Sequence, residues 1–181
     1  MVRRKVIVVA GLSGVGKSTC LKTLRRELDF VHLQASDLIR TERQEQEKAP
    51  VAHDLLRHNN IDDNQANLIS GFNKHAPEDG LIVLDGHTII DTTDGLVEIS
   101  PSVFSAISVS AFVVLVDDVE KIALRRAQDT LRARPARSHE ELVEQQMKSV
   151  VSAYRAALEL NVSMFVVPLD NASSLASLLS R

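Results

Sequence analysis

The chain has 181 residues, which is enough for one domain with a sizeable core and short for two. Aromatic residues make up only 3% of it, so aliphatic side chains must build the core, and a protein that stacks nucleic-acid bases on aromatic side chains is disfavoured. The formal net charge of −3 supplies no basic field for nucleic acid, and no apolar run reaches the ~18 residues of a membrane span. We expect a cytoplasmic protein with a single domain over residues 1–181.

Short apolar runs bounded by turn or helix signals predict the strands of a buried sheet. The first run, Lys5 to Ala10, is β-branched and does not alternate, which is typical of a strand covered on both faces. Similar runs cover residues 81–85, 111–116 and 163–167, and residues 30–34 are a weaker fifth candidate.

Helical patterns lie between these strands. They begin near Lys17, after Asp117-Asp118 and at Ser138, and a last one covers residues 173–179. The helix from Ser138 to Leu160 opens with a capping-box pattern and carries large apolar residues on roughly one side: Leu142, Val143, Met147, Val150, Val151, Tyr154 and Leu158. Alternating strands and helices predict an α/β fold, a five-stranded parallel sheet with helices on both faces. Residues 36–80 contain no convincing strand and form a helical insertion.

Residues 11–19, Gly-Leu-Ser-Gly-Val-Gly-Lys-Ser-Thr, fit the phosphate-binding pattern of P-loop proteins and stand between a predicted strand and a predicted helix. Glycines allow backbone N–H groups to turn inward around an anion, and the helix N-terminus adds partial positive charge. Lys17 can reach the β- and γ-phosphates, and Ser18 offers a hydroxyl to Mg²⁺. We predict an ATP site made by Gly11, Ser13, Gly14, Val15, Gly16, Lys17, Ser18 and Thr19. The alternative is a glycine-rich turn without a ligand.

Asp85 ends an apolar strand, which is the position of a carboxylate that holds Mg²⁺ directly or through water in P-loop proteins. We therefore predict Ser18 and Asp85 as the metal-binding residues. A turn or helix-capping aspartate is the alternative. The segment Asn73-Lys74-His75-Ala76 lacks the acid of the guanine-binding signature, which argues against a GTPase switch.

Basic residues gather between Arg125 and Arg137, at the end of the helix that follows a core strand. Phosphoryl transfer needs positive charge around the transferring group, and arginine binds phosphate oxygens with a planar fork. We predict that Lys17, Arg126, Arg132 and Arg134 stabilise that group. A solvated basic helix face is the alternative, although Pro135 favours a loop.

Several short motifs resemble those of the nucleoside monophosphate kinases, and in particular of the compact archaeal adenylate kinases. They are Ala35 to Arg40, Asp85-Gly86-His87, Thr92 to Gly95, Pro101 at a helix start, and Asp129 to Arg134, in this order along most of the chain. The resemblance implies a P-loop kinase in which residues 36–80 form an acceptor-binding insertion and residues 129–138 a short lid. It also leaves open a homo-oligomer, since that archaeal family is typically trimeric.

The resemblance implies transfer of the ATP γ-phosphate to a nucleoside monophosphate, AMP first, with Mg²⁺ as cofactor. It points to Asp37, Arg40, Arg57 and His87 as acceptor-binding residues, while Arg57 fits solvated surface and His87 a structural role equally well. Asn171 stands where P-loop kinases often contact adenine, although a helix cap explains it too. The arginine that follows Asp-Gly in adenylate kinases is absent, and Asp91 stands nearby. A kinase for another small acceptor, or a nucleotide-dependent binding or regulatory module, therefore remains an alternative.

Overall fold

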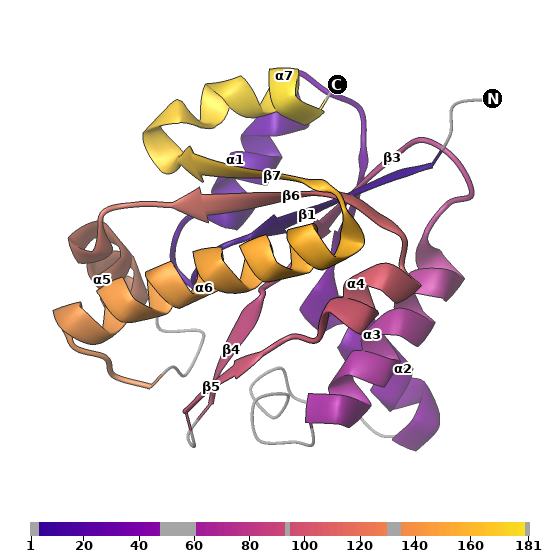
Figure 1. Ribbon diagram of the computed structural model, residues 1–181, viewed down its shortest axis with the longest axis horizontal. Helices are drawn as coiled ribbons and strands as arrows, with labels where there is room; N and C mark the ends of the chain where they lie inside the picture. The colour runs from indigo at the N-terminus through magenta and orange to yellow at the C-terminus, as the bar shows by residue number, and fades with distance from the viewer. Residues whose placement is uncertain (1–3, 48–60, 93–94, 130–134, 180–181) are drawn as a thin grey trace.

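A five-stranded parallel sheet forms the centre of the computed structural model, which describes residues 4–47, 61–92, 95–129 and 135–179 (Figure 1). Its spatial order is β2-β3-β1-β6-β7, and every neighbouring pair is parallel. The strands are β1 (Lys5–Ala10), β2 (Val31–Gln34), β3 (Leu81–Asp85), β6 (Val109–Val116) and β7 (Ser163–Pro168). The predicted α/β fold is confirmed, including the weakest strand, β2.

The order of the strands determines where a ligand can bind. The chain runs from β1 outward to β2, returns to insert β3 between them, and then crosses to β6 on the other side of β1. Ligands of open α/β sheets bind beyond the carboxyl ends of the strands where the order reverses, which here is beside β1. In this register Val9 of β1 lies opposite Asp85 of β3 and Val113 of β6.

Helices cover both faces of the sheet (Figure 1). One face packs on α1 (Lys17–Leu24), α7 (Leu175–Leu179) and the 3₁₀ segment η2 (Leu169–Ser174). The other face packs on α2 (Ala35–Glu47), α3 (Ile61–His75), α4 (Pro101–Ala106) and α6 (His139–Leu160), while α5 (Val119–Gln128) lies beyond the end of β6. Residues of β1 alternate between the two cores, Ile7 and Val9 on one side and Val6 and Val8 on the other. No helix within the described ranges is both long and apolar enough to cross a membrane.

A small hairpin that the sequence analysis does not predict follows β3. Its strands β4 (Ile89–Thr92) and β5 (Gly95–Glu98) pair antiparallel, apart from the main sheet. Each strand has only four residues, too few for a periodic pattern to stand out in the sequence. The hydroxyl of Thr92 donates to the carbonyl of Gly95 at 2.8 Å and helps to close the hairpin.

Helix α6 begins at the predicted capping box, in which Ser138 and Glu141 exchange hydrogen bonds. Its orientation differs from the one that its large apolar residues suggest. Leu142 points inward, together with small or polar residues such as Ser149, Ser152 and Ala153, while most of the large apolar side chains are exposed. Small residues allow close packing, and Ser149 and Ser152 hydrogen-bond with Thr88 at 2.9 to 3.1 Å.

The segment 36–80 is helical over most of its described part, as the sequence predicts, and its last five residues lead without helix into β3. Helices α2 and α3 pack together, and a buried carboxylate joins them: Glu42 accepts hydrogen bonds from Ser70 at 2.7 Å and Lys74 at 2.8 Å. These two donors hold the pKa of Glu42 below its ordinary value against the opposing effect of burial. The negative charge of Glu42 therefore stabilises the packing of α2 on α3.

We predict that Glu42→Gln lowers the melting temperature at neutral pH by about 5 °C, because a hydrogen bond to a buried charge is lost. The folded-state pKa of Glu42 is lowered, so its stabilising effect is present above the unfolded-state pKa and disappears as the pH falls through the folded-state value. Thermal unfolding of both proteins from pH 7 into the acid range measures this, and the two melting temperatures should converge at low pH.

Glu45→Gln is the matched control, since exposed Glu45 contacts the same Lys74 at 3.0 Å. An exposed ion pair contributes little, so this variant should melt near the wild type. Equal effects of the two substitutions at neutral pH would contradict the special role of Glu42.

Candidate functional site

The loop between β1 and α1 has a backbone that only glycine allows at key points. Gly11 and Gly16 have φ values of +146° and +108°, which lie in the region that L side chains rarely adopt. A Cβ on Gly11 would lie 2.6 Å from the carbonyl oxygen of Leu115 in β6. A Cβ on Gly16 would lie 3.0 Å from the side chain of Leu169. The loop is therefore pressed against β6 at Gly11 and against Leu169 at Gly16, where only glycine fits without a shift of its neighbours.

Lys17 begins α1 and is buried, with 7% of its surface exposed. Its ammonium donates to the carbonyl oxygens of Gly11 at 3.0 Å and Leu12 at 3.4 Å, so the side chain folds back along the loop. Ser18 and Thr19, in the first turn of α1, are exposed beside it. A lysine, a hydroxyl and the amino end of a helix thus meet around one cradle, which is a donor set suited to phosphate and its metal ion.

Asp85 lies at the carboxyl end of β3, next to the P-loop, and is 5% exposed. His32 of β2 lies beside it, with Nε2 3.6 Å from Oδ2 of Asp85. Burial acts to raise the pKa of Asp85, but His32, Lys17 and His87 outweigh that effect and hold the pKa below its ordinary value. The carboxyl group is therefore ionised at neutral pH, as a ligand of Mg²⁺ must be.

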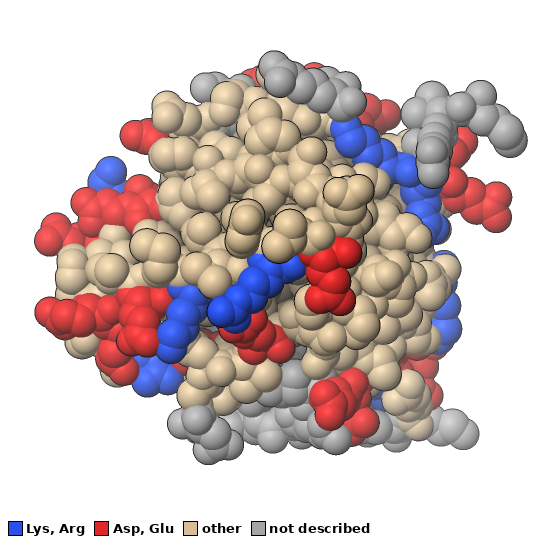
Figure 2. All heavy atoms as spheres, in the orientation of Figure 1, with Lys and Arg blue, Asp and Glu red and all other residues tan. Residues whose placement is uncertain are grey.

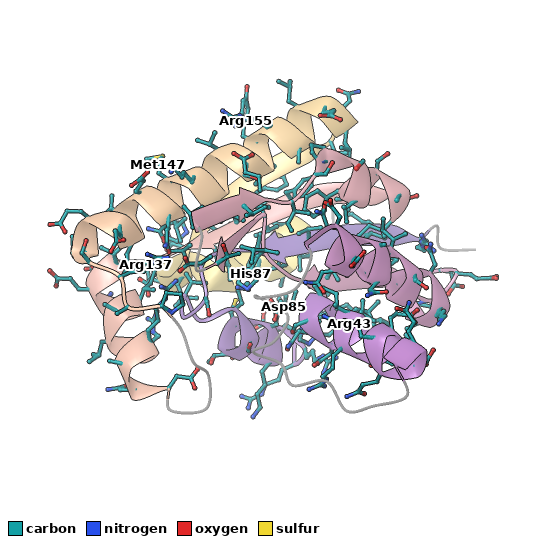
Figure 3. All side chains as sticks on the ribbon, turned by 90° about the horizontal axis from the view of Figure 1, so that it is seen from below. Arg43, Asp85, His87, Arg137, Met147 and Arg155 are labelled. Atoms are coloured by element: carbon teal, nitrogen blue, oxygen red, sulfur yellow. The ribbon has the colours of Figure 1, made fainter. Side chains whose placement is uncertain are left out.

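His87 follows Asp85 and bonds to the P-loop. Its Nδ1 lies 2.8 Å from the carbonyl oxygen of Gly11, and because a carbonyl can only accept, Nδ1 carries the proton. Figure 3 labels Asp85 and His87, which lie together at this edge of the sheet. The hydrogen bond ties the segment after β3 to the start of the phosphate-binding loop.

Two arginines of α5 hold the P-loop from the other side. Arg125 donates to the carbonyl of Val15 at 3.1 Å and forms an ion pair with Asp117 at 2.6 Å. Arg126 donates from Nε to the carbonyl of Ser13 at 2.8 Å. The basic end of α5 therefore binds the backbone of the loop.

A cleft of about 470 Å³ joins the P-loop to the face of the sheet covered by α2, α3 and α4. Its first half is polar and contains the loop, Asp85 and His87. The rest of its lining is mainly apolar, with Ile39, Leu68, Ile90, Ile99 and Phe104. Gln34, Ser36 and Asn64 add hydrogen-bonding side chains there. The cleft offers one end that suits phosphate and another that suits a flat or apolar group.

The structure brings many of the predicted site residues to this cleft. Those lining it are Ser13, Gly14, Gly16, Lys17, Ser18, Thr19, Asp85 and His87. Gly11 and Val15 belong to the same loop but do not line the cleft. Arg126 lies next to it, on a cavity of about 60 Å³ that shares Ser13 and His87.

Other predicted residues lie elsewhere. Arg40 forms an ion pair at 2.9 Å with Asp37, one turn earlier on α2, and neither lines the cleft. Asn171 is exposed in η2, away from the lining, where its carbonyl accepts a bond from Ser174. Arg57, Arg132 and Arg134 lie outside the described residues.

The sequence analysis missed several residues of the site. Arg125 belongs to the predicted basic cluster, but its spacing of eight residues from Asp117 gives no direct signal that the two side chains pair. His32 stands on the weakest strand, and its contact with Asp85 follows only from the pairing of β2 with β3. Gln34 lies on β2 and Asn64 on α3, and both line the cleft. Neither residue belongs to a sequence motif that indicates a binding site. Arg137 pairs at 2.8 Å with Asp91, which occupies the region of the absent arginine.

We predict that Lys17→Ala weakens ATP binding by at least about tenfold, because a charge-assisted hydrogen bond to phosphate is lost. Titration calorimetry with ATP measures the change. Lys22→Ala is the control, since Lys22 is an exposed lysine on the same helix. Similar affinities for the Lys17→Ala variant and the control would contradict an ATP site at this loop.

We predict that Asp85→Asn weakens the response to Mg²⁺ by about 10–100-fold, as loss of a group near a metal usually does. The measurement is nucleotide affinity as a function of Mg²⁺ concentration, and Asp37→Asn, outside the cleft, is the control. Binding of ATP without metal should persist in the Asp85→Asn variant, and an unchanged Mg²⁺ dependence would exclude Asp85 from the metal site.

Two solved structures share this architecture. One is a shikimate kinase from Bacteroides thetaiotaomicron, with a TM-score of 0.57 and 16% identity over 97% of this chain and 96% of that one. The other is a sugar kinase from Janibacter sp. HTCC2649, with a TM-score of 0.52 and 17% identity over 96% and 91%. At such identities they show the fold alone.

Sequence comparison is more specific. A family model described as an AAA domain (AAA_17) matches residues 10–143. An adenylate kinase from Methanothermobacter thermautotrophicus is 30% identical over 159 residues, which are 85% of this chain and 85% of that protein. Since the model and the archaeal relative each match most of the chain, this protein belongs to that AAA domain family and to the P-loop nucleoside monophosphate kinases.

Proposed function

We propose that this protein is an ATP-dependent kinase that transfers the γ-phosphate to a nucleoside monophosphate, with AMP as the first candidate. The observation that carries the proposal is the single cleft in which a phosphate cradle opens into a mainly apolar chamber. A nucleobase needs apolar faces and a few hydrogen-bonding groups at its edge. Ile39, Leu68 and Phe104 offer such faces, and Gln34 and Asn64 carry amides beside them.

The residues of the P-loop would bind the donor. Backbone N–H groups and Lys17 would hold the β- and γ-phosphates, and the transfer would be direct, without a covalent enzyme intermediate. Ser18 and Asp85 would hold Mg²⁺, which when bound neutralises charge on the phosphates. His87, bonded to Gly11, would fix the loop next to the point where the two halves of the cleft meet.

The acceptor would lie against α2 and α3, within the segment 36–80. We propose that Arg126 stabilises the transferring group from α5, together with Arg132 and Arg134 of the segment 129–138. Closure around both substrates would exclude water, which otherwise competes as the acceptor.

A second candidate is a kinase for a small acceptor without a phosphate. The pairing of Arg40 with Asp37 favours it, since this arginine is engaged outside the cleft. Among the described arginines, only Arg125 lines the cleft, and it is bonded to the loop and to Asp117.

A coupled assay of ADP formation with ATP, Mg²⁺ and a panel of acceptors tests the proposal. The panel contains AMP, the other monophosphates, the matching nucleosides, and neutral sugars and hydroxy acids. We expect AMP to raise ADP formation at least about tenfold above the ATP-only rate, with two ADP formed per AMP consumed.

The Lys17→Ala variant is the control for a contaminating kinase, and it should lose the stimulation. Stimulation by a nucleoside or sugar, and by no monophosphate, would replace the proposal with the second candidate. If no acceptor stimulates turnover while ATP still binds, the chain is a nucleotide-binding module and the kinase proposal is wrong.

A further inference from the structure

The polar side chain of Gln145 is buried on the inner side of α6. Only 4% of its surface is exposed, and Leu142 and Ser149, about one turn before and after it, are buried on the same side of the helix. The amide oxygen Oε1 of Gln145 has no hydrogen-bond partner among the described residues. Buried polar groups of folded proteins almost always have a partner, so this oxygen points to a small molecule that donates a hydrogen bond to it.

The neighbouring Gln146 fixes the position of α6 at this point. Its amide oxygen accepts from the backbone N–H of Asp117 at 3.1 Å, and its amide nitrogen donates to the carbonyl of Asp117 at 3.0 Å, so the helix is tied to the end of β6. Figure 2 shows charged side chains of both signs along α6, and the exposed ion pair of Lys148 with Glu144, at 2.6 Å, belongs to this outer side. Gln145 is therefore held with its amide directed away from the charged surface.

Gln145 lines a small cavity beside the phosphate-binding loop. The cavity has a volume of about 60 Å³ and shares Ser13 and His87 with the nucleotide cleft of about 470 Å³. A buried water molecule needs roughly 10–15 Å³ of such space and about two to four polar partners. The cavity therefore has room for water next to the cleft in which ATP would bind.

The other polar groups of the cavity suit a water molecule. Asp91 lines it, and although its carboxylate pairs with Arg137 at 2.8 Å, each carboxylate oxygen has a further lone pair. Arg126 lines it too and is held by the bond from its Nε to the carbonyl of Ser13 at 2.8 Å. Because Gln145 and Asp91 both present oxygen atoms, the cavity favours a molecule that can donate two hydrogen bonds, as water does.

The cavity lies at the end of the loop where the γ-phosphate of ATP would bind. Lys17, the residue type that contacts the β- and γ-phosphates in P-loop proteins, places its ammonium 3.0 Å from the carbonyl oxygen of Gly11 and 3.4 Å from that of Leu12. Leu12 and Ser13 line both the cleft and the cavity. A water molecule held by Gln145 would therefore lie on the γ-phosphate side of the loop.

We propose that Gln145 positions a water molecule for a slow hydrolysis of ATP that needs no acceptor. The water oxygen bonds to the γ-phosphorus, the bond from that phosphorus to the bridging oxygen of ADP breaks, and one proton passes to the solvent, so that the products are ADP and inorganic phosphate. Some P-loop proteins use a glutamine to orient the attacking water in this way. The activity goes beyond the proposed kinase function, because it requires ATP at the loop and does not depend on the acceptor.

The release of inorganic phosphate from ATP and Mg²⁺, without any acceptor, tests the proposal. Transfer to an acceptor forms ADP but no inorganic phosphate, so this measurement separates hydrolysis from the kinase reaction. The wild type should release phosphate at least about tenfold faster than Lys17→Ala, because that variant loses a cation at the reacting phosphate.

Gln145→Met keeps an unbranched side chain of similar size and removes both hydrogen-bonding groups. We expect the kcat of hydrolysis to fall at least about tenfold, since the water is no longer oriented, while the KM for ATP stays close to the wild-type value. The melting temperature should not fall, because an amide with an unpaired oxygen is replaced by an apolar group. Gln145→Ala gives a second measure if the methionine variant folds poorly.

Gln128→Met is the matched control, because Gln128 is an exposed glutamine at the end of α5 that lines neither the cleft nor the cavity. This variant should hydrolyse ATP like the wild type. A wild type no faster than Lys17→Ala would overturn the proposal. So would a Gln145→Met protein with the wild-type kcat, or one whose loss lies in ATP affinity and not in kcat.

The two proposals of this article can fail separately in these assays. If phosphate is released as expected while no acceptor stimulates ADP formation, the kinase function is wrong and the role of Gln145 stands. If an acceptor stimulates ADP formation and the wild type releases no phosphate without it, the kinase function stands and the role of Gln145 is wrong.

Discussion

Two opposite charges, Lys17 and Asp85, lie close together at the carboxyl edge of the sheet because β1 pairs with β3, and the whole site is arranged around them. Asp85 is buried and would be costly there without a partner; the cationic or hydrogen-bonding side chains around it keep it ionised. Lys17 is buried too, and satisfies its ammonium on the carbonyls of Gly11 and Leu12. When a phosphate ligand binds with a metal ion, the phosphate would lie near the positive charge of Lys17 and the metal ion near the negative charge of Asp85.

The rest of the fold holds this arrangement in place from three directions. Gly11 is pressed against β6, His87 bonds to the loop from the segment after β3, and the two arginines bond to it from α5. These contacts come from elements far apart in the chain. The loop therefore depends on contacts from the assembled sheet and from α5 as well as on its own strand–loop–helix unit.

The main sheet and the P-loop could be predicted because their signals are local. A β-branched run, a glycine-rich segment and a lysine follow one another within residues 5–17. They predict in turn a strand, a phosphate-binding loop and the start of a helix, and these local predictions agree with one another. The partners of the loop could not be predicted in the same way. His32 reaches Asp85 only because β2 pairs with β3, and Arg40, which its sequence context assigns to an acceptor phosphate, is held by Asp37 one turn away. The face that α6 turns to the sheet could not be predicted from its large apolar residues, because most of them are exposed while small residues such as Ala153 and Ala156 pack on the sheet.

The arginines of α5 have an electrostatic consequence for the loop that they hold. Each peptide unit joins the carbonyl of one residue to the N–H of the next, so a cation on the carbonyl of Ser13 withdraws electron density from the N–H of Gly14, and a cation on that of Val15 does the same for Gly16. Hydrogen bonds linked in this way polarise one another. Arg125 and Arg126 thus make the amides of the loop stronger donors toward an anion that neither guanidinium needs to touch.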